Sequence, residues 1–212
     1  MRMLLSAPFE DVASSISAHL ASAVDELAER RGFEVIRLYD GRATRLHFFL
    51  ANFRNPDFIF YSGHGLPERC CGIGAFGCFP FICFLDWSNA GWVRDKVLFL
   101  FACHTGLKLA PLLVERGAKA VFANTYYTFT FFPERGHDYL RDEMDVLLST
   151  VDVLFRGGTC GEAIETWRRK WSYYIDLYEM NPHWTAVEWY LTNAKAMRET
   201  FKLFGDPDAT II

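Results

Sequence analysis

Two apolar runs, each followed at once by small and reactive residues, set the architecture of this chain: Asp-Phe-Ile-Phe-Tyr-Ser-Gly-His-Gly at residues 57–65 and Val-Leu-Phe-Leu-Phe-Ala-Cys-His-Thr-Gly at residues 97–106. Unbroken apolar runs of this kind are typical of central parallel strands that are covered on both faces. In an open parallel sheet, ligands bind beyond the carboxyl ends of the strands. The two runs therefore predict a parallel α/β sheet with His64 and Cys103 at the same edge.

The alternation of strands and helices extends outward from these two runs. Apolar residues recur at helical spacing between glycine and proline breaks, and short apolar runs separate these stretches. Further strands are expected at residues 3–6, 33–39 and 118–124, and helices at residues 9–31, 44–53 and 107–116. Such alternation implies right-handed crossover units in one parallel sheet.

After the fifth strand the pattern changes to three long helices, expected at residues 135–155, 161–180 and 182–204. Thr159 and Glu162 have the spacing of a capping box, and Asn181-Pro182 predicts the start of the last helix. No polar linker or low-complexity tract separates this part from the sheet, so the helices are expected to pack on it. Residues 1–212 are therefore predicted to form a single domain.

Composition and charge exclude several classes of protein. The 212 residues are 51% hydrophobic and only 23% charged, which excludes a disordered chain. The net charge of −4, with lysines and arginines dispersed, argues against a nucleic-acid partner. The longest uncharged stretch, residues 70–85, is broken by glycines and a proline and is shorter than the ~20 apolar residues of a membrane span. The N-terminus lacks a secretory signal, so a cytoplasmic location is predicted.

His64 and Cys103 are residue types that together can cleave an amide bond. A thiolate is a strong nucleophile, and a nearby imidazole can protonate the departing amine. Gly65 has no side chain to block an approaching carbonyl, and the backbone amides of Gly65 and Cys103 are candidate donors to the developing oxyanion. Taken singly, such residues are more often a loop histidine and an inert buried thiol, so the hypothesis depends on their pairing. Neither a metal nor another cofactor is required.

With these motifs, the chain resembles the gingipain-type cysteine peptidases and, more distantly, the caspases, legumains, separases and CHAT-domain proteins. The resemblance rests on residues 61–65, 101–106, 109–113, 117–121 and 203–207. It implies a caspase-like three-layer sandwich, with a mainly parallel central sheet flanked by helices and a helical C-terminal third. It also implies a cysteine endopeptidase that acts on polypeptides through a dyad, onto which His64 and Cys103 map.

The resemblance also suggests residues that contact the substrate. In relatives the loop after the first strand helps to form the pocket for the residue before the scissile bond, and here that loop holds Glu10 and Asp11. An acid there would favour arginine or lysine, although both residues equally suit the first turn of the following helix. Tyr126 and Tyr127 follow the fifth strand, where relatives build pocket walls, although alternating aromatics are also typical of a core or an edge strand.

Four further cysteines, Cys70, Cys71, Cys78 and Cys83, lie in the long segment between the two apolar runs. Their spacing does not form the paired knuckles of a zinc site, and in a reducing compartment they are expected to be thiols rather than a disulfide framework. With the phenylalanines around them, they are expected to cover the active edge or to contact another chain.

Two other functions compete with the peptidase hypothesis. One is a catalytically inactive caspase-like adaptor that binds a protein through its aromatic loops. These loops, and C-terminal helices with apolar residues on more than one face, also allow a homo-oligomer. The other is a nucleotide-binding protein, which is disfavoured because the turn after the first strand, Ala7-Pro8-Phe9, has no glycine-rich phosphate loop.

Overall fold

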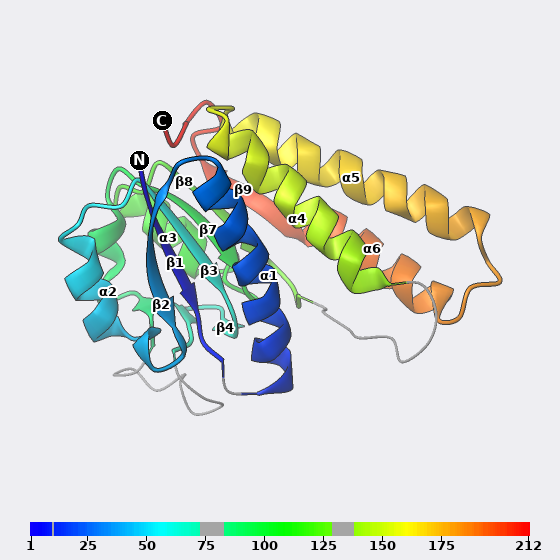
Figure 1. The fold of residues 1–212 in the computed structure, drawn as a ribbon, viewed down its shortest axis with the longest axis horizontal. Helices are drawn as coiled ribbons and strands as arrows, with labels where there is room; N and C mark the ends of the chain where they lie inside the picture. The colour runs from blue at the N-terminus through cyan, green and yellow to red at the C-terminus, as the bar shows by residue number, and fades with distance from the viewer. Residues whose placement is uncertain (10, 73–82, 129–137) are drawn as a thin grey trace.

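The computed structural model describes residues 1–9, 11–72, 83–128 and 138–212. Across these residues the central element is a six-stranded sheet with the order β2-β1-β3-β7-β8-β9 (Figure 1). Its strands are β1 (Arg2–Ala7), β2 (Glu34–Tyr39), β3 (Phe58–Ser62), β7 (Val97–Phe101), β8 (Ala120–Asn124) and β9 (Phe201–Gly205). The first five run parallel to one another, and β9 pairs antiparallel with β8.

Helices cover both faces of the sheet. The helical segments are α1 (Val12–Arg30), η1 (Asp40–Arg42), α2 (Arg45–Asn52), η2 (Ala90–Val93), α3 (Leu109–Glu115), α4 (Tyr139–Phe155), α5 (Cys160–Met180) and α6 (Val187–Thr200). Helices α1, α4, α5 and α6 share one core with the sheet, and α2 and α3 share a second core on its other face. The predicted α/β sandwich of three layers is thereby confirmed (Figure 1).

The alternation of side chains along each strand sorts the apolar residues into these two cores. In β7, Val97, Phe99 and Phe101 face the core shared with α1, α4 and α5, whereas Leu98 and Leu100 face the core shared with α2 and α3. All five side chains are buried. Successive strand residues point to opposite faces, so a strand covered on both faces is apolar throughout. This is why residues 58–60 and 97–101 of the two runs are apolar without interruption.

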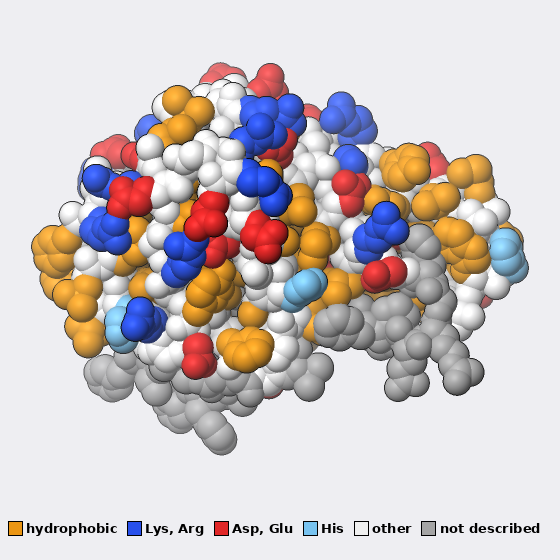
Figure 2. Space-filling model, viewed as in Figure 1, with side chains coloured by type: hydrophobic (Ala, Val, Ile, Leu, Met, Phe, Trp, Pro, Cys, Tyr) orange, Lys and Arg blue, Asp and Glu red, His pale blue; other side chains and the backbone are white. Residues whose placement is uncertain are grey.

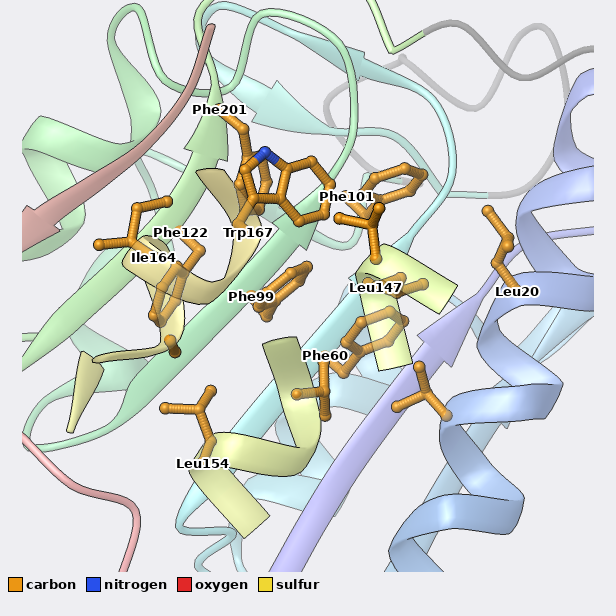
Figure 3. Packing of buried hydrophobic residues seen from close by; sticks show 14 of the residues in the cluster. Leu20, Phe60, Phe99, Phe101, Phe122, Leu147, Leu154, Ile164, Trp167 and Phe201 are labelled. Carbon is orange, nitrogen blue, oxygen red and sulfur yellow. The ribbon is translucent and has the colours of Figure 1, made fainter. Parts of the chain in front are cut away.

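Aromatic rings fill much of the larger core (Figure 3). Phe99 and Phe122, on neighbouring strands, stack with ring centroids 5.2 Å apart. The indole of Trp167, on α5, lies with its centroid 4.3 Å from that of Phe201 on β9. Its Nε1–H donates to the carbonyl of Met197 on α6 at 3.0 Å. The C-terminal helices therefore belong to the same core as the sheet.

The last strand was not predicted from the sequence. Residues 201–204, expected to end the last helix, instead belong to β9, whose Phe201 pairs with Asn124 and whose Gly205 pairs with Ala120. Without β9, β8 would be an edge strand with unpaired N–H and C=O groups. The hydrogen bonds that this segment makes with β8 outweigh its helical sequence pattern. The prediction of a helix there is wrong.

The boundaries of the C-terminal helices follow their caps. Thr159 and Glu162 form the predicted capping box at the start of α5. The prediction that Asn181-Pro182 starts the last helix is wrong. Asn181 is the C-cap of α5, and α6 begins at Val187 after Ala186, whose φ of 61° is left-handed. Asparagine suits a helix end as well as a helix start, which explains the error.

A second, smaller sheet follows the first apolar run. It consists of β4 (Gly65–Leu66), β5 (Arg69–Cys70) and β6 (Leu85–Asp86), paired antiparallel. Cys70 and Cys83 are buried free thiols, but Cys71 is disulfide-bonded, which differs from the expectation of thiols. Cys78 and the phenylalanines at 76, 79 and 81 lie outside the described residues.

Two searches of the described residues complete the fold. No group of three or more histidine, cysteine, aspartate or glutamate side chains gathers there in a way that could hold a metal ion. In the same parts of the chain, no helix combines the length and the apolar composition that crossing a bilayer requires.

Candidate active site

The parallel pairing of β3 with β7 brings His64 and Cys103 to the same edge. Ser62 is the register partner of Phe101, and the Gly63 N–H extends this pairing by donating to the Phe101 carbonyl at 3.2 Å. Continuing the register by two residues sets His64 opposite Cys103. The two residues therefore follow neighbouring strands at the carboxyl edge, where parallel sheets bind their ligands.

Gly65 allows the two chain segments to touch. A Cβ atom added at Gly65 would lie 2.5 Å from the carbonyl oxygen of Cys103 and 2.8 Å from the Cβ of Ala102. Both distances are too short for any side chain, and the obstacle on one side is backbone. The glycine beside His64 is thus needed for space, so that the backbone of residues 64–65 can pack directly on the backbone of residues 102–103.

His64 is fixed by its backbone and by its ring. Its carbonyl accepts hydrogen bonds from the Tyr61 hydroxyl at 2.8 Å and from the Cys71 N–H at 3.0 Å. Its Nε2 lies 2.7 Å from Oδ2 of Asp11. The side chains of His64 and Asp11 are 41% and 38% exposed, so the pair is accessible to solvent.

Asp11 is held in place by the start of α1. It is the N-cap of that helix, and its Oδ1 accepts from the Ser14 N–H at 2.7 Å while the Ser14 hydroxyl accepts from the Asp11 N–H. Burial raises the pKa of the Asp11 carboxyl, but the hydrogen bonds from the Ser14 N–H and from His64 outweigh it, so this pKa lies below its ordinary value. Asp11 is therefore an ionised partner for His64 near neutral pH.

Cys103 contacts a different set of groups. Its side chain is partly exposed, and its Sγ accepts a hydrogen bond from the Thr128 N–H at 3.3 Å. The Thr128 hydroxyl oxygen lies at the same distance of 3.3 Å. The next residue, His104, has a φ of 58°, and its ring packs edge-on against Tyr127 with centroids 4.4 Å apart. The second histidine of the motif thus faces the tyrosines that follow β8.

The two backbone amides expected to bind an oxyanion are not used by neighbouring strands. The Cys71 N–H donates to the His64 carbonyl, which makes Gly65 and Cys70 a non-hydrogen-bonded pair of the β4–β5 ladder. The N–H of Gly65 therefore points away from β5. The N–H of Cys103 donates to no described residue. Within the described residues, neither N–H is therefore engaged by a neighbouring strand.

The structure describes only some of the residues that the sequence suggests for substrate contact. Tyr126 and Tyr127 are about half exposed, at 47% and 49%, beside His104. Oδ2 of Asp11 lies beside the His64 ring, and its Oδ1 accepts the N-cap hydrogen bond from the Ser14 N–H. Asp11 therefore contacts the imidazole and also caps the helix. Glu10 lies outside the described residues.

Thr128 is the residue at this site that sequence reasoning missed. It lies in an aromatic segment in which nothing marks a threonine as special. Only the spatial pairing of the segment after β7 with the segment after β8 reveals its contact with Cys103. The His104 N–H donates to the Tyr126 carbonyl at 2.9 Å, and the Gly106 N–H to the Asn124 carbonyl at 2.7 Å.

Comparison with known proteins defines the class of fold. No family model matches the sequence, and no curated protein matches it either. Among solved structures, the fold is similar to that of the Arg-specific cysteine proteinase gingipain R, with a TM-score of 0.64 and 16% identity over 99% of this chain and 46% of that chain. It is also similar to a chain in the complex of the pro- and mature domains of RgpB from Porphyromonas gingivalis. That match has a TM-score of 0.57 and 17% identity, and covers 98% of this chain and 47% of the other.

The chain thus has the caspase-like α/β fold of a gingipain, as the resemblance implied. It spans about half the length of the solved chains that it matches. At this level of identity the comparison establishes the fold, and the chemistry has to be argued from the site.

Proposed function

We propose that this protein is a cysteine endopeptidase in which Cys103 is the nucleophile and His64 the general acid and base. The observation that carries the proposal is the close packing of the segments after β3 and β7. The β3–β7 register and the missing side chain at Gly65 bring the glycine that follows His64 against the backbone of Cys103 at the edge of the sheet. The solved structures with the same fold, described as cysteine proteinases, support the same reaction class.

In the proposed reaction, the Cys103 thiolate attacks the carbonyl carbon of the scissile peptide bond. The N–H groups of Gly65 and Cys103 donate to the oxyanion that forms. The C–N bond then breaks while the His64 imidazolium protonates the leaving amine, which leaves a thioester on Cys103. Water attacks the thioester while His64 takes its proton, and release of the carboxylic acid product restores the Cys103 thiolate and the His64 imidazolium.

Asp11 is proposed as a positioning residue for His64. A carboxylate 2.7 Å from Nε2 fixes the orientation of the ring and stabilises the imidazolium that protonates the amine. The capping hydrogen bonds with Ser14 fix the carboxylate in turn. This role differs from the substrate pocket first suggested for Asp11, because its oxygens are already engaged by His64 and by Ser14.

A preference for arginine or lysine before the scissile bond is the finer part of the proposal. It is supported by the description of one solved neighbour as Arg-specific. Tyr126 and Tyr127, half exposed beside the segment that follows Cys103, are suitable for packing on the long apolar stem of such a side chain. Glu10 is retained as the candidate acid for its charged end.

Hydrolysis of reporter peptides tests this function directly. Peptides with arginine, lysine, asparagine or aspartate before the scissile bond are incubated with the wild type, with Cys103→Ala, and with Cys160→Ala as a control that removes a buried thiol elsewhere. We expect the arginine and lysine peptides to be cleaved fastest, and Cys103→Ala alone to lose cleavage. Undiminished hydrolysis by Cys103→Ala would reject the nucleophile, and preference for aspartate would reject the basic pocket. If no peptide is cleaved by the folded wild type, the inactive adaptor becomes the better account.

A further inference from the structure

The strand β2 forms one edge of the six-stranded sheet, with β1 on one side and no strand of the described residues on the other. The Glu34 N–H donates to the Met1 carbonyl at 3.0 Å. In a parallel ladder the successive residues of a strand bond alternately toward its two sides, so every second residue after Glu34 also bonds to β1. The N–H and C=O groups of Val35 and Arg37 are therefore directed to the free edge.

A groove of about 590 Å³ lies between this edge and the helix α2. One side of the groove consists of residues 35–38 of β2, and the other includes His47, Leu50 and Ala51 of α2. Successive residues of a strand point to opposite faces of a sheet, and residues of both kinds line the groove. The groove therefore lies along the edge of the sheet rather than over one of its faces.

The helix α2 is apolar on its outward side as well as on its inward side. Phe48 and Ala51 are buried in the core beneath it, whereas Leu46, Phe49 and Leu50 are exposed. Figure 2 shows hydrophobic side chains gathered at the left of the molecule, where α2 lies in Figure 1. The outward side of a surface helix is normally polar, and a contiguous exposed apolar surface marks a site of interaction.

An open strand edge fits a second extended polypeptide. A strand added about 4.8 Å from β2 would bond to the N–H and C=O groups of Val35 and Arg37. Alternate side chains of the added strand would then point to the face of the sheet that α2 covers, where Leu50 offers apolar contact. The groove thus combines main-chain partners for a strand with an apolar wall for its side chains.

The charges of the groove favour an acidic segment over a second copy of this chain. The lining residues include three arginines and a histidine and no carboxylate. Arg37 and Arg54 already form ion pairs, but Arg42 is exposed and forms none with a described residue. Two copies docked edge to edge would bring the same arginines of both chains to one interface. A carboxylate on a different segment would instead pair with Arg42.

We propose that the groove between β2 and α2 binds an extended segment of another polypeptide, which adds to β2 as a strand. The segment carries apolar side chains at alternate positions and an acidic side chain beside Arg42. This site does not depend on the proposed function, because β1 separates β2 from β3, the strand that leads to His64. It gives the protein a second surface for polypeptides, away from the carboxyl edge of the neighbouring strands β3 and β7.

Selection from a library of random decapeptides displayed on phage tests this proposal. The target is the full chain with Cys103→Ala, so that bound peptides are not cleaved. The recovered peptides are synthesised with a fluorescein label, and their affinities are measured by fluorescence anisotropy. We expect the recovered sequences to alternate apolar residues with others and to carry aspartate or glutamate toward one end.

Matched variants in the same background locate the bound peptide. Val35→Pro removes an N–H from the free edge and should weaken binding by about tenfold or more, whereas Val35→Ala keeps that N–H and should weaken it by less than about threefold. Arg42→Glu should weaken binding by about fivefold or more, and Arg116→Glu, an exposed position after α3, should leave it unchanged. Thermal unfolding verifies each fold, and Arg42→Glu keeps the test decisive if Val35→Pro does not fold.

Amide hydrogen exchange, followed by NMR, tests the added strand itself. A bound peptide should slow exchange at Val35 and Arg37, which face the free edge. Exchange at Ile36 and Leu38, which already bond to β1, should change little. This pattern of alternation distinguishes an added strand from a peptide that contacts side chains alone.

Four results would overturn the proposal. The first is that no peptide is recovered, and the second is that recovered peptides bind equally well to Val35→Pro and Arg42→Glu. The third is slowed exchange confined to the segments after β3 and β7, which would place the peptide at the candidate active site. The fourth is slow exchange at Val35 and Arg37 without peptide, together with a dimer in sedimentation equilibrium, which would make a second copy the occupant.

Discussion

The carboxyl edge of the sheet and the layer formed by α4 and α5 hold their polar side chains in opposite ways. At the edge, His64 and Asp11 are partly exposed and paired at 2.7 Å, and Cys103 is partly exposed beside Thr128. In the helical layer, Glu143 is fully buried and neither carboxyl oxygen has a hydrogen-bond partner among the described residues. Burial raises the pKa of Glu143 well above its ordinary value, so the folded protein keeps that carboxyl protonated to a higher pH than the unfolded chain does.

This difference indicates that the carboxyl edge is suited to a reaction and that the helical layer stabilises the fold. His64, Asp11 and Cys103 at the edge are partly exposed and each contacts a polar partner, as a reaction centre requires. The helical layer seals one acid among apolar and aromatic side chains, where it cannot exchange protons with a substrate. Substitutions at the edge are therefore expected to change turnover with little effect on unfolding, and substitutions in the layer are expected to do the reverse.

The largest effect is expected for His64→Ala. Loss of the general acid and base should lower kcat by roughly 10²- to 10⁴-fold, with the unfolding temperature nearly unchanged. His104→Asn is the matched control, because asparagine tolerates the left-handed backbone at that position. It should retain turnover within about tenfold. Equal losses in the two variants, measured with the best reporter peptide, would contradict the assignment of His64.

The corresponding change in the helical layer is Trp167→Ala. Removing this fully buried indole should lower the free energy of unfolding by about 3–5 kcal/mol, as measured by urea unfolding. Tyr173→Ala, at an exposed position on the same helix, should cost within about 0.5 kcal/mol. The turnover of the folded fraction of Trp167→Ala should stay close to that of the wild type. A large loss of turnover per folded molecule would mean that the layer takes part in the chemistry.

Gly65→Ala tests the contact on which the edge depends. The new Cβ would lie 2.5 Å from the Cys103 carbonyl oxygen, so the segments that carry His64 and Cys103 must move apart. A misplacement of about 1 Å at a reaction centre costs roughly 100-fold in turnover. Gly91→Ala is the control, since no atom lies within 4 Å of the added Cβ. If the two variants turn over equally fast, the close approach of the two segments has no functional role.

Asp11→Asn separates the two roles of Asp11. Asparagine caps a helix about as well as aspartate, so α1 and the unfolding temperature should be preserved. The uncharged amide cannot stabilise the imidazolium, and kcat should fall roughly tenfold. Ser14→Ala, which removes the other half of the capping box, should instead lower stability by about 1 kcal/mol with kcat nearly unchanged. The opposite result in these two variants would make Asp11 a helix cap only.

The smallest effect is expected for Glu143→Gln, and it depends on pH. Because the folded protein keeps the Glu143 proton while the unfolded chain releases it above about pH 4, this residue lowers stability as pH rises. Glutamine removes that dependence. The unfolding temperature of the variant should equal that of the wild type at pH 4 and exceed it by a few degrees at pH 8. Identical pH slopes would show that Glu143 is ionised in the folded protein.

Part of this arrangement could be predicted from the sequence. Both apolar runs are central strands, because only strands covered on both faces lack polar residues throughout. The position of His64 and Cys103 just beyond them predicts a shared edge. The glycine after His64 signals a close approach, although the atoms that come close, those of Cys103 and Ala102, are visible only in the structure.

The partners of the two groups could not be predicted in the same way. Asp11 reaches His64 because β1 lies beside β3, and the order of strands in a sheet is not written in local periodicity. Thr128 reaches Cys103 through the pairing of two segments that follow different strands. The strand β9 was missed for a related reason, since an edge that needs a partner lies far from residues 201–205 in the sequence. Local sequence patterns therefore predict the helices and strands, whereas the contacts between distant residues depend on how the strands pair.

Labelling with an arginyl acyloxymethyl ketone tests the central claim most directly. This electrophile reacts slowly with ordinary thiols and rapidly with a thiolate that a bound peptide group places next to it. The native protein should form one covalent adduct, mapped by mass spectrometry to Cys103, and both the denatured protein and His64→Ala should react far more slowly. An adduct on a different residue, or equal labelling of native and denatured protein, would contradict the account.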